Sequence, residues 1–288
     1  DLNMCFGGFP NTGSGTLNGL GDATDDVIVA SKDADFTLTD GSLASSDGMS
    51  LSLSNIELAT LTNSGTGSHS FTVSGRTTGG TLNGSAATAD TVISTSAAAT
   101  VTLTNTTLVR SGTVTLNLTN IEQATLTGGG GNNVIDASAF TLGAVTLNGE
   151  NGNDTLTGGS GADTINGGLA SDSLTGGAGN DSFVFDTLLG GNIDAITDFA
   201  DAGAVNTDEI VLDQTVFVLL TQLGDLTAAQ FQSSTADQAT VTGAVIIYET
   251  DTGFLYYDTN GTTAGGNVQF ATVTGAPALD VSDFTVIG

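Results

Sequence analysis

The chain has 288 residues, enough for two domains or one elongated domain, and carries 31 acidic residues against only three basic ones. Its formal net charge of −28 at pH 7 argues against nucleic-acid binding and against adsorption to an anionic membrane, because both depend on Lys and Arg. No apolar run reaches membrane-spanning length, so direct membrane insertion is not expected, and the one cysteine, Cys5, forms no internal disulfide.

The first half of the chain contains an internal repeat. Residues 1–15, rich in Gly and Asn, are expected to form an N-terminal lead-in. The sequence Thr-Leu-Asn-Gly then recurs every 65 residues, at 16–19, 81–84 and 146–149. The intervening segments align without gaps, so that Asn-Ile-Glu occurs at 55–57 and again at 120–122. One long self-similar period predicts a stacked architecture.

Within each copy the local pattern is that of β-strands. Residues 49–53 and 114–118 alternate apolar and polar side chains, and clusters of Gly, Asn, Asp and Ser separate such segments. No helical stripe is present over residues 16–186. We therefore predict two 65-residue Thr/Gly-rich β repeats over 16–145 as part of a parallel β-solenoid. The alternative is a pair of β-sandwich modules of about 65 residues, which is short for that fold.

Residues 149–184 consist of four consecutive nine-residue units. The sixth position of each unit is Asp and the eighth is a large apolar residue: Asp154, Asp163, Asp172 and Asp181, and Leu156, Ile165, Leu174 and Phe183. Each unit predicts a tight Gly-rich turn followed by a three-residue strand with one inward side chain. Because two units make one turn of the coil, units 18 residues apart stack and bring two carboxylates and several carbonyls around one space. This all-oxygen environment suits Ca²⁺, and folding is expected to be linked to its binding.

A disordered Gly/Asn/Asp-rich linker is the alternative, but it does not explain a strict nine-residue register. These units closely resemble the RTX, or haemolysin-type, calcium-binding nonapeptide family, whose motif is G-G-x-G-x-D-x-U-x. The resemblance implies a parallel β-roll over 146–186, secretion by a type I pathway and folding in extracellular calcium.

The resemblance also implies a set of calcium ligands. These are the four aspartates at position six and the backbone carbonyls at positions two and four of each unit: Glu150, Gly152, Gly159, Gly161, Gly168, Ala170, Gly177 and Gly179. Units one and three are expected to share one ion, and units two and four another. Glu150 and Ala170 depart from the motif because each replaces a glycine, and their carbonyls serve only if the turn still forms.

Residues 187–288 are expected to close the roll and to form a small C-terminal β-rich domain with a type I secretion signal, by the same resemblance. Asp194, Asp198 and Asp208 are either further ligands at the open end or turn and cap residues. A hairpin is predicted from the two strands 245–250 and 253–258, with a third strand at 268–273. A short helix capped by Thr227 is predicted over 226–231.

Three other features are candidates for chemistry. His69 is the only histidine, and with no Ser or Cys partner in the sequence we expect a structural role. In Asn-Ile-Glu, the Ile is expected in the core and the polar pair at a turn edge, although a ligand role for the carboxylate is the alternative. Residues 128–136 form a weakened nonapeptide with Asn133 in place of Asp, and Asn133 or Asp136 could add a ligand.

Motifs for known catalytic classes are absent from the sequence, including H-E-x-x-H, G-x-S-x-G and the P-loop. A carboxylate pair for glycoside hydrolysis stays open, although the chain has no Trp to line a sugar cleft. We therefore expect a non-enzymatic, secreted, calcium-binding structural protein, similar to RTX-type surface-layer proteins. Such a protein would self-assemble on the bacterial cell surface as a layer, filament or coat, with cell-surface polysaccharide as a second candidate partner. The alternatives are the folding and secretion tail of a larger exoenzyme, or a carbohydrate-binding adhesin.

Overall fold

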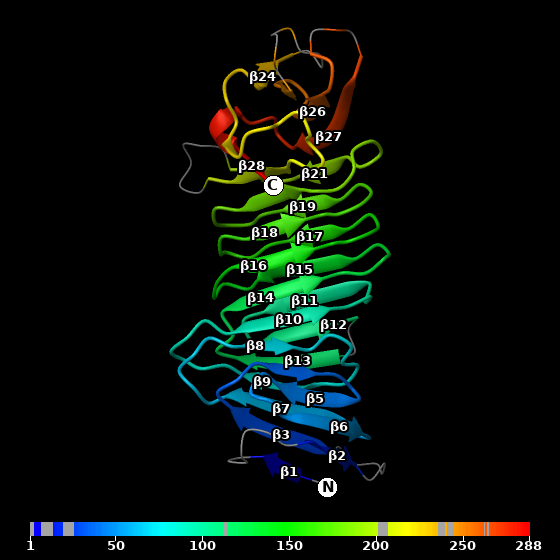
Figure 1. Cartoon of the computed structure of the whole chain (residues 1–288), viewed down its shortest axis with the longest axis vertical. Helices are drawn as coiled ribbons and strands as arrows, with labels where there is room; N and C mark the ends of the chain where they lie inside the picture. The colour runs from blue at the N-terminus through cyan, green and yellow to red at the C-terminus, as the bar shows by residue number, and fades with distance from the viewer. Residues whose placement is uncertain are drawn as a thin grey trace.

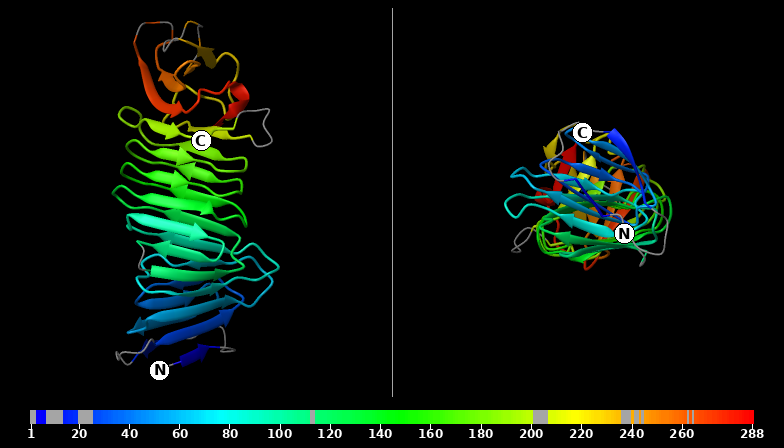
Figure 2. Two further views of the ribbon diagram at one scale, coloured as in Figure 1. Left: turned by 180° about the vertical axis from the view of Figure 1, so that it is seen from behind. Right: turned by 90° about the horizontal axis from the view of Figure 1, so that it is seen from below.

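The computed structural model describes residues 3–6, 14–19, 26–111, 114–200, 207–235, 240, 243, 245–261, 263 and 265–288. It is an elongated stack in which two long sheets face each other, with the first strand at one end and the C-terminal hairpins at the other (Figures 1 and 2). None of the helices in the described ranges has the length and apolar character that crossing a bilayer requires.

Most neighbouring strands in both sheets are parallel. The first sheet has 15 strands, in the spatial order β1 (Asn3–Phe6), β3 (Val27–Lys32), β7 (Leu58–Asn63), β9 (Gly80–Asn83), β13 (Val114–Thr119), β12 (Thr107–Arg110), β11 (Thr100–Thr104), β15 (Val134–Ala139), β17 (Thr155–Thr157), β19 (Ser173–Thr175), β21 (Asp194–Ile196), β27 (Asn267–Val273), β26 (Phe254–Asp258), β25 (Ile246–Glu249) and β24 (Phe231–Ser234).

The second sheet has 13 strands, in the order β2 (Ser14–Asn18), β6 (Ser50–Ser54), β5 (Ser42–Ser45), β4 (Phe36–Leu38), β8 (Ser70–Thr72), β10 (Thr91–Thr95), β14 (Gln123–Thr127), β16 (Val145–Asn148), β18 (Thr164–Asn166), β20 (Ser182–Phe185), β22 (Glu209–Asp213), β28 (Phe284–Ile287) and β23 (Gly224–Asp225). A single 3-10 turn, η1 (Val281–Asp283), precedes β28. The all-β solenoid predicted from the sequence is thus confirmed, and the sandwich alternative is not.

The nonapeptide tract has the predicted stacking. Its strands alternate between the sheets, and Leu156 of β17 pairs in register with Leu174 of β19, 18 residues further on. In the facing sheet, Ile165 of β18 pairs with Phe183 of β20. All four side chains are fully buried. The core in this region is therefore one side chain wide on each sheet, because a three-residue strand points only its middle residue inward.

The 65-residue repeat has a property that its spacing alone does not reveal. Equivalent strands lie in opposite sheets: β2 and β16 belong to the second sheet, whereas β9, from the intervening copy, belongs to the first. Each copy contains an excursion of three antiparallel strands within one sheet, β4–β5–β6 in the first copy and β11–β12–β13 in the second. With this excursion counted once, a copy passes between the sheets an odd number of times. The next copy therefore starts on the opposite face.

The C-terminal region shares both sheets with the roll. Strand β27 pairs with β21, and β28 pairs with β22, so the two sheets continue across the junction without a break. The predicted hairpin is confirmed as the antiparallel pair β25 and β26, and the predicted third strand is β27.

The predicted helix over 226–231 is wrong. Thr227 accepts a single turn hydrogen bond from the Gln230 N–H, at 2.9 Å, and the chain then extends into β24. Pairing with β25 satisfies the main chain of this segment, and the Phe231 ring packs against Phe284 with the ring centroids 5.3 Å apart. The tertiary contacts of an extended strand outweigh a weak local helix propensity.

The one-residue-wide core makes a sharp prediction about two leucines of the same unit. Leu174 is fully buried, whereas Leu169 is 42% exposed. Leu174→Ala should lower stability by about 2–5 kcal/mol through the lost burial and the cavity left behind. Leu169→Ala should cost less than about 0.5 kcal/mol. Urea denaturation in saturating Ca²⁺ measures both, and equal costs would contradict this description of the core.

Candidate metal centre

The aspartates of the nonapeptide tract lie inside the stack, between successive turns. Together with two aspartates that follow the tract, all are at most 5% exposed: Asp154, Asp163, Asp172, Asp181, Asp194 and Asp208. The glycine at the first position of each unit makes room for them. A Cβ at Gly149 would clash with the Asp154 carboxylate and with the Gly167 carbonyl of the stacked turn. These glycines leave a space lined by oxygens.

One carboxylate oxygen of each aspartate holds the preceding turn. The Asp154 N–H donates to Oδ1 of Asp172 at 2.7 Å, and the Asp172 N–H donates to Oδ1 of Asp194 at 3.0 Å. On the other side of the roll, the Asp163 N–H donates to Oδ1 of Asp181 at 2.8 Å. The aspartates therefore form two ladders, one along each edge of the roll.

The second carboxylate oxygen has a different environment. Among the residues that the structure describes, Oδ2 of Asp154, Asp172 and Asp181 is buried without a hydrogen-bond partner. Oδ2 of Asp163 accepts from the Gly159 N–H at 2.6 Å. A buried carboxylate oxygen without a partner is costly, and a hard cation that takes oxygen ligands would remove this cost. The side chains present thus fit Ca²⁺.

Burial also shifts the titration of these groups in the metal-free protein. It raises the pKa of Asp172 to about 6, with the Asp154 hydrogen bond opposing and the Asp154 charge adding to the rise. Burial likewise raises the pKa of Asp181 and of Asp194 to about 7. At neutral pH, the folded protein without a cation therefore retains protons on carboxyl groups that ionise when unfolded.

The carbonyls at positions two and four stack turn over turn. A Cβ on Gly168 would clash with the Glu150 carbonyl, and one on Gly179 would clash with that of Gly161. Position two of unit four, Gly177, lies over the Gly159 carbonyl in the same way. Units one and three, and units two and four, are thus brought together as expected from the sequence. Gly152 lies against Gly131, in the turn before the tract.

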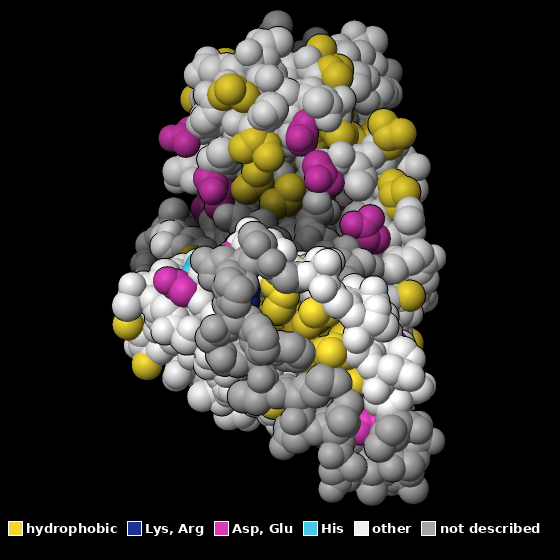
Figure 3. Space-filling view, turned by 60° about the horizontal axis from the view of Figure 1, so that its bottom comes forward, with side chains coloured by type: hydrophobic (Ala, Val, Ile, Leu, Met, Phe, Trp, Pro, Cys, Tyr) yellow, Lys and Arg dark blue, Asp and Glu magenta, His cyan; other side chains and the backbone are white. Residues whose placement is uncertain are grey.

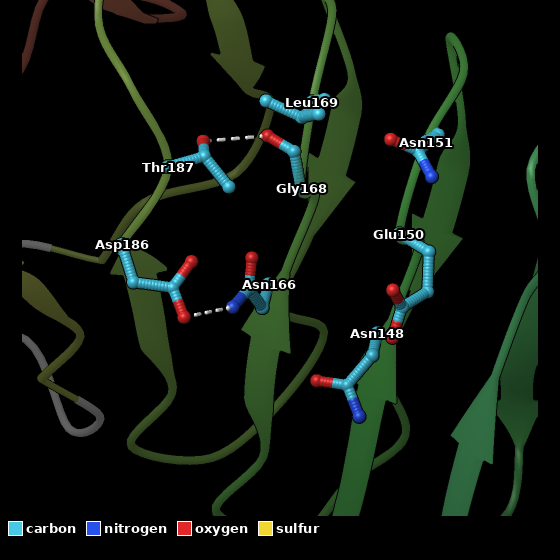
Figure 4. Close-up of a pocket in the computed structure, with 8 residues that line it drawn as sticks. All are labelled: Asn148, Glu150, Asn151, Asn166, Gly168, Leu169, Asp186 and Thr187. Carbon is cyan, nitrogen blue, oxygen red and sulfur yellow. Dashed lines mark hydrogen bonds between the residues drawn. The ribbon is translucent and has the colours of Figure 1, made fainter.

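The two departures from the motif keep the backbone of the turn. Glu150 has φ 75° and Ala170 has φ 83°, the left-handed region that favours glycine. The Glu150 side chain lies outside the turn, where it lines a surface pocket with Asn148 and Asn166 (Figure 4). In the same pocket the Gly168 carbonyl, a predicted ligand, accepts a hydrogen bond from Thr187 Oγ1 at 2.8 Å.

The aspartates after the tract divide into two kinds. Asp194 and Asp208 continue the ladders, since Oδ1 of Asp208 accepts from the Asp181 N–H at 3.0 Å. Asp198 is exposed, and its two oxygens accept from the N–H groups of Gly176 and Gly177 at 2.8 and 2.9 Å. Asp198 thus caps the last glycine turn, whereas Asp194 stands where the next ligand of the column would be.

The upstream repeats contain ladder carboxylates that the sequence did not identify. The Asp26 N–H donates to Oε2 of Glu57 at 2.9 Å, and the Asp90 N–H donates to Oε2 of Glu122 at 3.0 Å. These are the glutamates of the two Asn-Ile-Glu segments. The asparagines before them have φ near 50°, and both isoleucines are buried. The expected core Ile and turn-edge polar pair are confirmed, and the 65-residue recurrence was the available signal for the role of Glu.

Asparagine closes two upstream turns without a cation. The amide of Asn133 accepts from the Gly129 N–H and donates to the Ala98 carbonyl, both at 2.9 Å. Asn63 likewise accepts from Gly65 at 3.0 Å and donates to the Gly67 carbonyl at 2.9 Å. Both ends of these amides are occupied, so a ligand role for Asn133 has no support. Asp136 Oδ1 accepts from the Ser138 N–H at 2.9 Å instead of pointing to the tract.

His69 has the structural role expected from the sequence. Nε2 lies 2.8 Å from Oδ1 of Asp33, and Nδ1 lies 3.4 Å from Oδ1 of Asp35. These two carboxylates outweigh partial burial and raise the pKa of His69. Within the described ranges, no three His, Cys, Asp or Glu side chains come together as a metal site. An ion in the tract would therefore take most of its ligands from main-chain carbonyls.

The raised pKa values predict that acid stabilises the calcium-free fold. Between about pH 4 and about pH 7 the folded chain binds more protons than the unfolded chain, so its stability should fall as pH rises. In EGTA, the urea midpoint followed by circular dichroism should be higher at about pH 5 than at about pH 8. Saturating Ca²⁺ should remove this trend because the ions replace the protons. A calcium-free midpoint that rises with pH would refute the assignment.

The strained backbone at Ala170 gives a second prediction. Ala170→Gly should raise stability in saturating Ca²⁺ by about 1 kcal/mol, because glycine adopts the left-handed region without a steric penalty. Ala178 is exposed in the next unit and has no positive φ. Ala178→Gly is therefore the matched control and should lower stability by a few tenths of a kcal/mol to about 1 kcal/mol through chain entropy. Urea midpoints of equal sign for both variants would refute the strain at Ala170.

Comparison with known proteins supports the calcium assignment. A family model described as RTX calcium-binding nonapeptide repeat (4 copies) matches residues 125–140 and 143–183. No curated protein matches the chain. The solved structure described as the extracellular lipase LipA from Serratia marcescens is similar with a TM-score of 0.31 and 14% identity, over 80% of this chain and 38% of the lipase chain.

The matched family accounts for the carboxylate ladders of the tract. RTX nonapeptide repeats bind Ca²⁺, act as a structural and not a catalytic motif, and are found in proteins secreted by the type I pathway. The match begins at residue 125 and so includes the weakened unit around Asn133. With its Asp columns, glycine turns and stacked short strands, this chain is an RTX-type, calcium-binding protein of the secreted class.

Proposed function

We propose that the protein is a structural component outside the bacterial cell, folded by Ca²⁺ and assembled from copies of itself into a layer, filament or coat. The observation that carries the proposal is the exposed strand edge at the N-terminal end of the stack. Within the described residues, β1 pairs only with β3 and β2 pairs only with β6. Unpaired strand edges are templates for further pairing.

The other end of the stack is closed differently. Strand β23 runs antiparallel to β28 at the end of the second sheet, and β24 follows two antiparallel pairings at the end of the first. Two copies would therefore meet most readily through their N-terminal edges, or through acidic side surfaces bridged by Ca²⁺. The face in Figure 3 displays several acidic side chains and little basic surface, which favours divalent bridges.

Two alternatives have support of their own. The same open edges would also accept strands from a preceding segment, as expected if the chain is the folding and secretion tail of a larger exoprotein. A carbohydrate-binding adhesin is supported by the surface pocket of about 450 Å³ in Figure 4, lined by Asn148, Asn151, Asn166 and the carboxylates of Glu150 and Asp186. Amides and carboxylates of this kind bind sugar hydroxyls.

The test is light scattering after size separation, with circular dichroism on the same sample, as Ca²⁺ is titrated into EGTA-treated protein. We expect β-structure to form first and regular assemblies to follow. Thr16→Lys, on the exposed face of the edge strand β2, should block assembly and leave folding intact. The matched control is Thr102→Lys in β11, which has a neighbour on both sides.

Each alternative has its own outcome in this experiment. A folded protein that stays monomeric at all Ca²⁺ concentrations would favour the tail of a larger exoprotein. Assembly lost equally in both variants would transfer the contact from the strand edge to the acidic side surfaces. Glycan-array binding by the calcium-loaded monomer would favour the adhesin.

A further inference from the structure

Two of the three basic side chains in this strongly acidic protein are buried. Arg76 is 2% exposed and Arg110 is 4% exposed. The third, Lys32, makes a surface ion pair in which Nζ lies 2.7 Å from Oδ2 of Asp47. Burying a guanidinium is costly unless its charge and its N–H groups find partners. The environment of the two arginines therefore requires an explanation.

The partners of the two arginines are mainly neutral carbonyls. Arg110 donates from Nη1 to the Val73 carbonyl at 3.1 Å and from Nη2 to the Arg76 carbonyl at 2.6 Å. Arg76 donates from Nη2 to the Glu57 carbonyl at 2.9 Å. Among the residues described, Arg76 Nε, Arg76 Nη1 and Arg110 Nε have no hydrogen-bond acceptor.

Negative charge near the pair is limited to one partly exposed carboxylate in ion-pair contact. Asp40 Oδ1 lies 3.5 Å from Arg76 Nη1, too long and indirect for a good hydrogen bond. The oxygens of Asp40 instead accept from the main chain and hydroxyl of Thr77, at 2.9 and 2.5 Å. Burial lowers the pKa of both arginines, and the charge of Arg110 lowers that of Arg76 further. The pair therefore lacks one negative charge.

Both arginines line the same cavity, of about 330 Å³. Its remaining wall is formed largely by small residues and hydroxyl groups, the latter from Thr77, Thr95, Ser96 and Ser111. No carboxylate lines it. Guanidinium groups together with hydroxyls are the donors that recognise carboxylate, sulfate and phosphate. The cavity is large enough for one such group and too small for a folded segment.

We propose that this cavity binds one oxyanion group, with the two guanidiniums as charge partners and the hydroxyls of its wall as further donors. The anion would supply the negative charge that the fold lacks at this point. Its source is either a free inorganic anion or the charged group of an acidic sugar. The site lies in the upstream repeats, at the ends of strands β10 and β12, and is independent of the calcium tract and of self-assembly.

The test is isothermal titration calorimetry on the full calcium-loaded chain with three ligands: sodium sulfate, sodium glucuronate and glucose. We expect one anion per chain and no heat from glucose. Arg110→Gln should weaken binding at least tenfold, whereas Lys32→Gln, which removes a surface charge, should leave it unchanged. Sulfate binding alone would identify a free inorganic anion as the ligand, and tighter binding of glucuronate would identify an acidic sugar. No binding of either anion to the unaltered chain would overturn the proposal.

A second variant covers the case in which Arg110→Gln fails to fold. Ser96→Asp places a carboxylate at the cavity and should raise the melting temperature and abolish anion binding together. The matched control is Thr106→Asp, in an exposed turn away from the cavity, which should not raise the melting temperature of so acidic a chain. A lower melting temperature for Ser96→Asp than for Thr106→Asp would overturn the proposal.

Discussion

A core only one side chain wide cannot fix the turns that surround it, and the rest of this structure depends on how that problem is solved. Each three-residue strand of the tract buries a single apolar residue, such as Leu156 or Ile165. The turns between strands contain carbonyls that lie over one another and would repel without a positive group between them. Something with a positive charge or a positive dipole must therefore lie at each edge of the stack.

The chain has several solutions to this one problem. In the tract, each aspartate holds the preceding turn with Oδ1 and leaves Oδ2 for a cation. Upstream, the amide of Asn133 donates directly to a stacked carbonyl, and Arg110 does the same with its guanidinium. Glu57 and Glu122 take over the main-chain contacts that Asp makes in the tract. The upstream repeats are thus held by covalently attached donors, and the tract is held by ions from solution.

The sequence was most informative where the period was short. A nine-residue register fixes which residue points inward, so the pairing of Leu156 with Leu174 followed directly from an 18-residue turn. The helix expected at 226–231 failed because Phe231 contacts Phe284, a residue more than 50 positions away. The buried arginines could not be predicted either, because nothing local distinguishes Arg76 and Arg110 from surface cations. Long-range packing decides both cases, and a single sequence does not contain it explicitly.

The alternation of the 65-residue copies between sheets has a consequence for the outer surface. Because equivalent strands lie on opposite faces, any surface feature that both copies share is displayed twice, in nearly opposite directions. The protein is thus an approximate twofold screw built within one chain, without any second subunit. A contact that is weak on one face is available again on the other, which would let one molecule join two neighbours across its thickness. Duplication by a whole number of turns would have placed both copies on the same side and given only a longer surface.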